Sequence, residues 1–138
     1  MKTLIVDDEN SIRQMMKFFL EKFGRTDVAS NGEEAIRFFL QAWKDNEPYD
    51  LICMDIMMPQ MNGKESLKNI RELEKTMGIK SSQEVKVLMI TALGDPKNVF
   101  ESYFKSGATG YIVKPFERED LYKAILGLGL NTGKAGKF

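Results

Sequence analysis

The stretch YDLICMDIMMP, residues 49–59, decides the fold class and points to a site. Its centre, residues 51–54, is an unbroken apolar run, typical of a strand that is covered on both faces of a sheet. The run ends in Asp55, and Asn62-Gly63 soon afterwards is a turn signal. Because ligands of open α/β sheets bind beyond the carboxyl ends of the strands, Asp55 is a candidate site residue. The alternative is that Asp55 only caps the next helix.

Strand and helix patterns alternate five times along the chain. The expected strands are residues 3–6, 26–29, 51–54, 85–90 and 110–113, and the expected helices are residues 10–23, 33–44, 64–77, 95–105 and 117–128. This alternation predicts an α/β fold with a parallel sheet and helices on both faces. We expect one domain over residues 1–130 and a flexible tail over residues 131–138, which are rich in Gly and Lys.

Composition excludes several classes of protein. The 138 residues carry 20 basic and 20 acidic side chains, so net charge gives no reason to expect direct binding of nucleic acid or of an anionic membrane. No apolar run approaches the roughly 20 residues that span a bilayer, and no signal peptide is evident, so we expect a cytoplasmic protein without membrane insertion. There is no histidine, which excludes Ser-His-Asp and Cys-His nucleophiles and imidazole-ligated zinc. The single cysteine, Cys53, is expected in the core.

Polar residues follow four of the five expected strands. They are Asp7 and Asp8, Asp55, Thr91 and Lys114. Right-handed crossovers place the carboxyl ends of all the strands at one edge of the sheet, so these side chains should converge. Three carboxylates without histidine or thiolate suit a hard cation, Mg2+ before Mn2+ or Ca2+. A hydroxyl and an ammonium can hold phosphoryl oxygens, which predicts phosphoryl transfer with Asp55 as the nucleophile.

These motifs, taken together, resemble a known family. Asp7-Asp8, Asp55 with Pro59 and Gly63 after it, Thr91-Ala92, and Lys114-Pro115-Phe116 are similar to the signature of CheY-like receiver domains of two-component response regulators. The resemblance extends from Lys2 to about Leu128. It implies a flavodoxin-like three-layer sandwich with a five-stranded parallel sheet of order 2-1-3-4-5 and five helices.

The resemblance also implies a phosphoacceptor and a metal site. Asp55 would accept a phosphoryl group from a histidine kinase or a histidine phosphotransfer protein. Asp8 and Asp55 would bind Mg2+ directly and Asp7 through water. The backbone carbonyl of Met57 would be a further ligand.

The resemblance also assigns residues to the response to phosphorylation. Thr91 and Lys114 would hold the phosphoryl oxygens, and the Lys114–Pro115 bond would be cis. Thr91 and Tyr111 would form the switch: as the hydroxyl moves toward the phosphoryl group, the aromatic ring turns inward. The alternative for Tyr111 is a half-exposed residue of the sheet with no switching role.

The helix expected over residues 95–105 is broadly apolar. Phe100 and Phe104, with Tyr111, are expected to form a surface for a downstream effector protein, or for a phosphorylation-dependent homodimer. The alternative is that the apolar side chains of this helix cover neighbouring helices.

Two features depart from the usual family pattern. The connector over residues 76–84 is longer than in most receivers. The extra residues are either a tolerated surface excursion or a feature that docks a partner. Met57 and Leu93 are apolar where many relatives are polar. We expect them to hinder the hydrolytic water and to slow the loss of phosphate.

The favoured interpretation is a stand-alone signalling receiver that catalyses only its own phosphorylation and dephosphorylation; an excised piece of a longer regulator is the alternative. A rival from another class is a Mg2+-dependent phosphatase with an aspartyl nucleophile. Such enzymes need a general acid two residues after the nucleophile, where this chain has Met57. A flavin-binding electron carrier is disfavoured because residues 7–9 are all acidic and would repel a phosphate.

Overall fold

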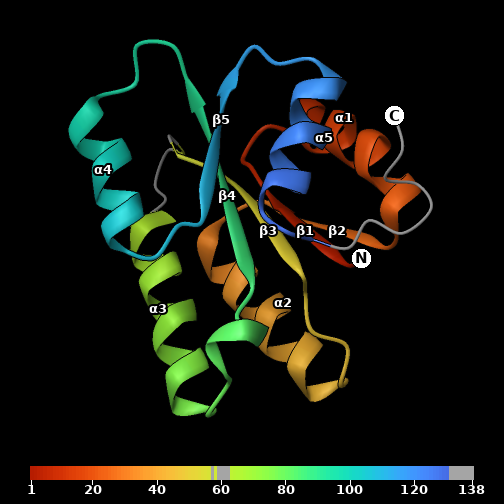
Figure 1. Ribbon diagram of the computed structural model, residues 1–138, viewed down its shortest axis with the longest axis vertical. Helices are drawn as coiled ribbons and strands as arrows, with labels where there is room; N and C mark the ends of the chain where they lie inside the picture. The colour runs from red at the N-terminus through yellow and green to blue at the C-terminus, as the bar shows by residue number, and fades with distance from the viewer. Residues whose placement is uncertain (57, 59–62, 131–138) are drawn as a thin grey trace.

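A single parallel sheet organises the molecule (Figure 1). The computed structural model describes residues 1–56, 58 and 63–130, and for Phe100 only the backbone. The strands are β1 (Thr3–Val6), β2 (Thr26–Ala29), β3 (Leu51–Asp55), β4 (Lys86–Ala92) and β5 (Gly110–Lys114). Their order is β2-β1-β3-β4-β5 with every pair parallel, which confirms the predicted flavodoxin-like topology.

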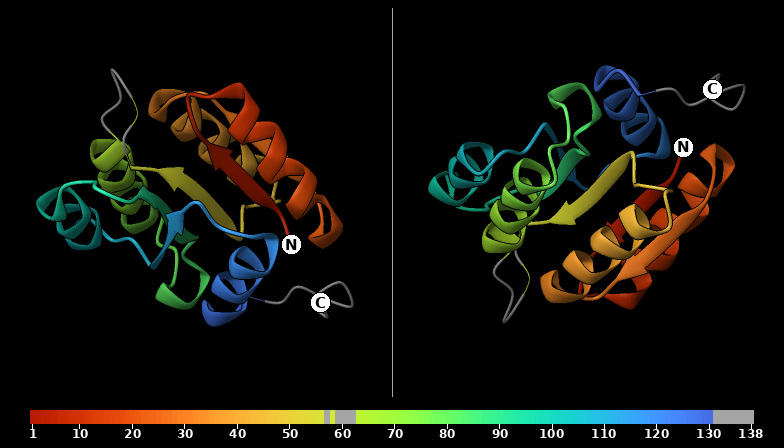
Figure 2. Two further views of the ribbon diagram at one scale, coloured as in Figure 1. Left: turned by 90° about the horizontal axis from the view of Figure 1, so that it is seen from above. Right: turned by 90° about the horizontal axis from the view of Figure 1, so that it is seen from below.

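Helices cover both faces of the sheet (Figure 2). They are α1 (Asn10–Leu20), α2 (Gly32–Lys44), α3 (Gly63–Thr76), α4 (Lys97–Lys105) and α5 (Arg118–Gly127). Successive residues of a strand point to opposite faces, so Leu4 and Ile52 pack with α2, α3 and α4, whereas Ile5 and Cys53 pack with α1 and α5. Cys53 is buried as expected, and burial raises the pKa of its thiol to about 12.

Strand β4 is longer than the sequence predicts. Beyond Ile90 it continues through Thr91 and Ala92, which pair with Val113 and Lys114 of β5. Pairing with a neighbouring strand extends an element past the end of its apolar run, which a local pattern does not reveal. Thr91 is therefore fixed within the sheet and not in the loop that follows.

The predicted cap and first helical residue of α4 are each wrong by one residue. The Asp95-Pro96 pair suggested a cap followed by the first helical residue. In the structure Pro96 is the cap, with extended backbone at φ −60° and ψ 132°, and the helix begins at Lys97. The Asp95 carboxylate instead accepts hydrogen bonds from the Thr91 hydroxyl and the Ala92 N–H, which a tight turn brings to it.

The long connector after α3 is held by a buried ion pair. Glu74 accepts the Val85 N–H at 2.8 Å and pairs with the Arg71 guanidinium at 2.6 Å. Arg71 also donates two hydrogen bonds to the carbonyl of Gly107, in the turn before β5. The connector contains a short 3-10 helix, Ser81–Gln83, and its end is tied to α3 by this carboxylate.

Candidate functional site

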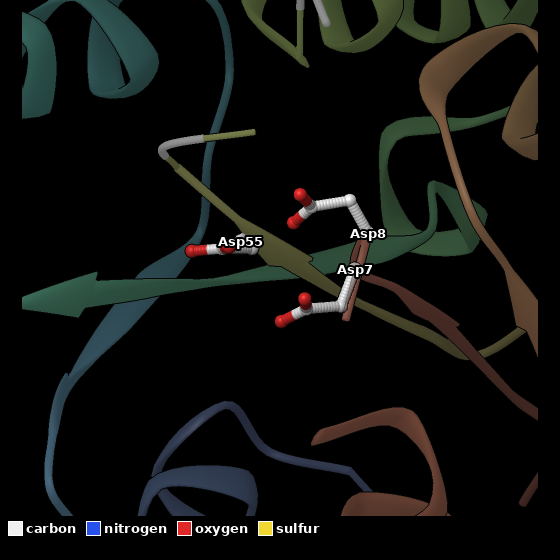
Figure 3. Close-up of side chains that lie close together, drawn as sticks. All are labelled: Asp7, Asp8 and Asp55. Atoms are coloured by element: carbon white, nitrogen blue, oxygen red, sulfur yellow. The ribbon is translucent and has the colours of Figure 1, made fainter. Parts of the chain in front are cut away.

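Three carboxylates meet at the carboxyl edge of the sheet (Figure 3). Asp7 and Asp8 follow β1, and Asp55 is the last residue of the neighbouring strand β3. One oxygen from each of the three lies within 4.8 Å of the others. Asp7 and Asp55 are buried, whereas Asp8 is exposed. The three carboxylates thus converge at one edge, and their spacing could hold a single cation between them.

Local contacts orient Asp7 toward the cluster. Its Oδ1 accepts the Glu9 N–H at 2.9 Å, while its backbone carbonyl accepts a hydrogen bond from Arg13 at 2.6 Å. Its Oδ2 is buried and has no hydrogen-bond partner among the described residues. A buried carboxylate oxygen without a partner is costly, and a hard cation is a suitable partner for it. The donor set and this oxygen therefore fit a divalent metal.

Lys114 brings a positive charge to the same place. Its Nζ lies 3.5 Å from Asp55 Oδ1 and 3.8 Å from Asp7 Oδ2. The side chain is only partly buried, so its ammonium is shared between the cluster and solvent. The Lys114–Pro115 peptide bond is cis, which confirms the expectation from the resemblance.

The environment of Asp55 opposes its ionisation. The pKa of Asp55 is raised to about 6: burial is the largest cause, the Asp7 charge adds to it, and Lys114 opposes both effects. The pKa of Asp7 is raised as well, mainly by burial, although the hydrogen bond from the Glu9 N–H lowers it in part. One ammonium does not compensate three neighbouring carboxylates, so this arrangement favours the binding of a cation.

Thr91 lies at the same edge of the sheet, but its hydroxyl is hydrogen-bonded to Asp95 and not to the carboxylate cluster. Its hydroxyl donates to Asp95 Oδ2 at 3.0 Å, and the same oxygen accepts the Ala92 N–H at 2.7 Å. Sequence reasoning missed this use of Asp95, because an Asp before a Pro at the start of a helix suggests a cap. The only available signal was that Asp95 lies four residues after the predicted hydroxyl.

Tyr111 and Phe104 are neighbours on the surface formed by α4 and β5. Tyr111 is 51% exposed and Phe104 36%. Their rings meet edge to face, with centroids 6.1 Å apart. The side chain of Phe100, also expected on this surface, lies outside the described residues, as does the whole of Met57.

Tyr103 of α4 is buried. Its hydroxyl donates to the carbonyl of Ile56 at 3.1 Å, in the residue directly after Asp55. Burial first, and the Asp55 charge second, raise the pKa of this phenol to about 12. Sequence reasoning missed Tyr103, which joins α4 to the loop that carries Asp55.

Leu93 extends into solvent at this edge. Its side chain is 80% exposed, so in this conformation it does not cover the carboxylates. The expectation that Leu93 and Met57 slow the loss of phosphate concerns the phosphorylated protein and stays a prediction.

Comparison with known proteins agrees with this geometry. The sequence model of the response regulator receiver domain matches residues 3–126. The transcriptional regulatory protein ResD of Bacillus subtilis is 37% identical over 128 residues, which are 92% of this chain and 47% of ResD. SrrA of Staphylococcus aureus, also named a transcriptional regulatory protein, is 36% identical over 126 residues, 91% of this chain and 46% of SrrA. The chain therefore spans about half the length of these relatives.

Solved structures give the same result. The chemotaxis protein CheY4 of Vibrio cholerae superposes with a TM-score of 0.73 at 31% identity, covering 92% of this chain and 97% of CheY4. A structure of the Saccharomyces cerevisiae phosphotransfer protein Ypd1 with the receiver domain of Ssk1 matches with a TM-score of 0.72 at 31% identity, covering 91% of this chain and 86% of the matched chain.

Within the part of the chain that the structure describes, no helix has both the length and the apolar character to cross a membrane.

Proposed function

The chain belongs to the response regulator receiver domain family, a signalling component of two-component systems, and we propose that it is switched by phosphorylation of Asp55. One observation carries this proposal: the Asp55 carboxylate is buried at the sheet edge with the Asp7 and Asp8 carboxylates and the Lys114 ammonium around it. Such a site can accept a phosphoryl group on one oxygen while neighbouring groups neutralise the added charge.

The transfer follows from the chemistry of a carboxylate nucleophile. An Asp55 oxygen forms a bond to phosphorus as the bond from phosphorus to the donor's histidine nitrogen breaks, and that nitrogen keeps the electron pair. Lys114 attracts the phosphoryl oxygens, and Thr91 donates a hydrogen bond to one of them after its hydroxyl has turned from Asp95. The acyl phosphate that results is later attacked by water, which returns Asp55 to its carboxylate.

Mg2+ is the proposed cofactor. Asp8 and Asp55 would hold it directly and Asp7 through water, and when bound it neutralises the carboxylates and the phosphoryl oxygens. The carbonyl of Met57, outside the described residues, is proposed as a further ligand. The buried Asp7 Oδ2, which has no hydrogen-bond partner among the described residues, supports a cation at this position.

The phosphoryl donor is proposed to be a histidine kinase or a histidine phosphotransfer protein. In support, the receiver domain of Ssk1, which matches this fold, was crystallised with the phosphotransfer protein Ypd1. Downstream, we propose that Thr91 and Tyr111 switch the face formed by α4, β5 and α5 toward an effector protein or a second copy. Exposed Tyr111 and Phe104, in contact with each other, are the side chains on which this surface is proposed.

The expectation of no direct nucleic-acid contact applies only to this domain and stays a proposal, because ResD and SrrA are named transcriptional regulators. A location in the cytoplasm is likewise a proposal. The chain is proposed to catalyse only its own phosphorylation and dephosphorylation. No observation favours the phosphatase alternative.

The test uses acetyl phosphate as the donor. Incubation with Mg2+ should add one phosphoryl group per chain, sensitive to hydroxylamine, and peptide mapping should place it on Asp55. Asp55→Asn, or EDTA with the wild type, should abolish the adduct. Asp45→Asn is the matched control, because Asp45 is an exposed carboxylate at the end of α2. Rapid turnover of phosphate monoesters, or an adduct elsewhere, would refute the proposal.

A further inference from the structure

The turn between β4 and α4 places a second acceptor next to Thr91. Asp95 closes this turn, with its N–H donating to the Ala92 carbonyl at 3.1 Å. Its carboxylate points back along β4, where one oxygen accepts both the Thr91 hydroxyl at 3.0 Å and the Ala92 N–H at 2.7 Å. Since Pro96 serves as the cap of α4, this carboxylate is used by the end of the strand and not by the helix.

In the phosphorylated protein, the Thr91 hydroxyl would have two possible acceptors, the Asp95 carboxylate and the phosphoryl group on Asp55. A hydroxyl carries one proton and donates one strong hydrogen bond at a time. Thr91 is buried, so in this arrangement its proton is directed to Asp95 and not to water. For Thr91 to donate to a phosphoryl group on Asp55, the bond to Asp95 has to break.

We propose that Asp95 is a positioning residue that holds Thr91 in its unphosphorylated orientation and that a phosphoryl group must displace. This inference rests on the proposed phosphorylation of Asp55 and adds a residue that controls its response. A bond to a charged acceptor is stronger than one to a neutral acceptor, so the competition favours the resting state. Asp95 is only partly buried and keeps the Ala92 N–H, so water can replace Thr91 when the hydroxyl leaves.

The location of Asp95 gives the release of Thr91 a structural consequence. Asp95 is one residue before the cap of α4 and two before its first helical residue. Breaking the bond from Thr91 removes one of the contacts that tie the start of α4 to β4. The other end of α4 is tied by Tyr103 to the carbonyl that follows Asp55. Helix α4 and the residue before its cap are thus connected by hydrogen bonds to the ends of β4 and β3, two of the strands that carry the site.

The test measures binding of fluoroberyllate, a tetrahedral mimic of a phosphoryl group, in the presence of Mg2+. Asp95→Ala removes the competing acceptor and should tighten binding by roughly 3- to 10-fold, the range expected for losing a charge-assisted bond that water partly replaces. Asp95→Asn keeps an uncharged acceptor oxygen and should give a smaller increase. Affinity for Mg2+ alone should stay within about 2-fold, because Asp95 does not belong to the three-carboxylate cluster.

Two measurements separate competition for the Thr91 proton from a general effect on the fold. In a Thr91→Ala background, Asp95→Ala should raise fluoroberyllate affinity by much less than in the wild type, because there is no hydroxyl to release and only the charge of Asp95 is removed. In the metal-free protein, methyl couplings measured by NMR should show one side-chain rotamer of Thr91 in the wild type and averaging in Asp95→Ala. If Asp95→Ala does not fold, Asp95→Asn carries both measurements.

The outcomes distinguish this inference from the proposed function. Unchanged or weaker fluoroberyllate binding in both Asp95 variants, with normal binding by the wild type, overturns the role of Asp95 and leaves phosphorylation of Asp55 standing. An equal gain in the Thr91→Ala background also overturns it. A wild type that neither binds fluoroberyllate nor accepts phosphate from acetyl phosphate overturns the proposed function and this inference with it.

Discussion

Asp55→Asn should stabilise the metal-free protein, although it removes the proposed phosphoacceptor. Burial and the Asp7 charge raise the pKa of Asp55 from 3.8 to about 6. At 1.36 kcal/mol for each pKa unit, ionised Asp55 costs the folded state up to about 3 kcal/mol at neutral pH. Asparagine avoids this cost but leaves Lys114 with one fewer carboxylate. We therefore expect a net gain of about 1–2 kcal/mol in the free energy of unfolding.

The pH dependence gives the sign of this effect independently. Because its pKa is raised in the folded state, Asp55 binds a proton more readily when the protein is folded. Its unfavourable contribution is therefore complete above pH 6 and is lost as the pH falls toward 3.8. The advantage of Asp55→Asn should be largest at pH 7.5, about half as large at pH 5 and small at pH 4.

Urea unfolding in EDTA, followed by circular dichroism, measures this difference directly. Asp45→Asn, at an exposed carboxylate, should change stability little at any of these pH values. Added Mg2+ should stabilise the wild type and reduce or reverse the advantage of Asp55→Asn, because binding to the folded state adds to its stability. A less stable Asp55→Asn variant in EDTA at pH 7.5, or an advantage independent of pH, would refute the electrostatic account of the site.

Three further substitutions test other parts of the structure. Tyr103→Phe removes the hydrogen bond between α4 and the loop after β3 and should cost about 1 kcal/mol in urea unfolding, with Phe104→Leu as the exposed control. Glu74→Ala leaves the partly buried Arg71 guanidinium without its ion-pair partner and the buried Val85 N–H without its acceptor, and should cost about 3 kcal/mol, far more than Glu72→Gln on the same helix. Met57→Asn/Leu93→Glu should shorten the lifetime of the phosphorylated protein, measured by release of labelled phosphate; an unchanged lifetime removes that idea.

The convergence of the site was predictable because it depends on topology more than on local detail. An apolar run that ends in a polar residue gives both the strand and the position of its carboxyl end. Right-handed crossovers then bring Asp7, Asp55 and Lys114 to one edge, where the structure finds them. Small errors in the strand boundaries do not affect this inference, as the extension of β4 to Ala92 shows.

The partners of individual side chains were not predictable, because tertiary contacts decide them. The Asp95-Pro96 pair has the local pattern of a helix start, yet pairing of β4 with β5 places a hydroxyl and an N–H closer to the carboxylate. Similarly, the apolar residues of α4 indicated a wide hydrophobic surface without telling which side chain lies inside. Tyr103 is buried because its hydroxyl finds an acceptor in the Ile56 carbonyl, and a backbone carbonyl has no sequence signature.

The charge balance of the site links the metal, the phosphoryl group and Asp95. Three carboxylates against one ammonium leave a formal excess of two negative charges, which one divalent cation balances. A phosphoryl group on Asp55 replaces one carboxylate charge by about −1.5 to −2, so the filled site is again negative. Asp95 then adds a further negative charge on the far side of Thr91. Phosphorylation is therefore opposed both by the hydrogen bond that Asp95 accepts from Thr91 and by the charge of Asp95, and Asp95→Asn should relieve the second opposition while retaining part of the first.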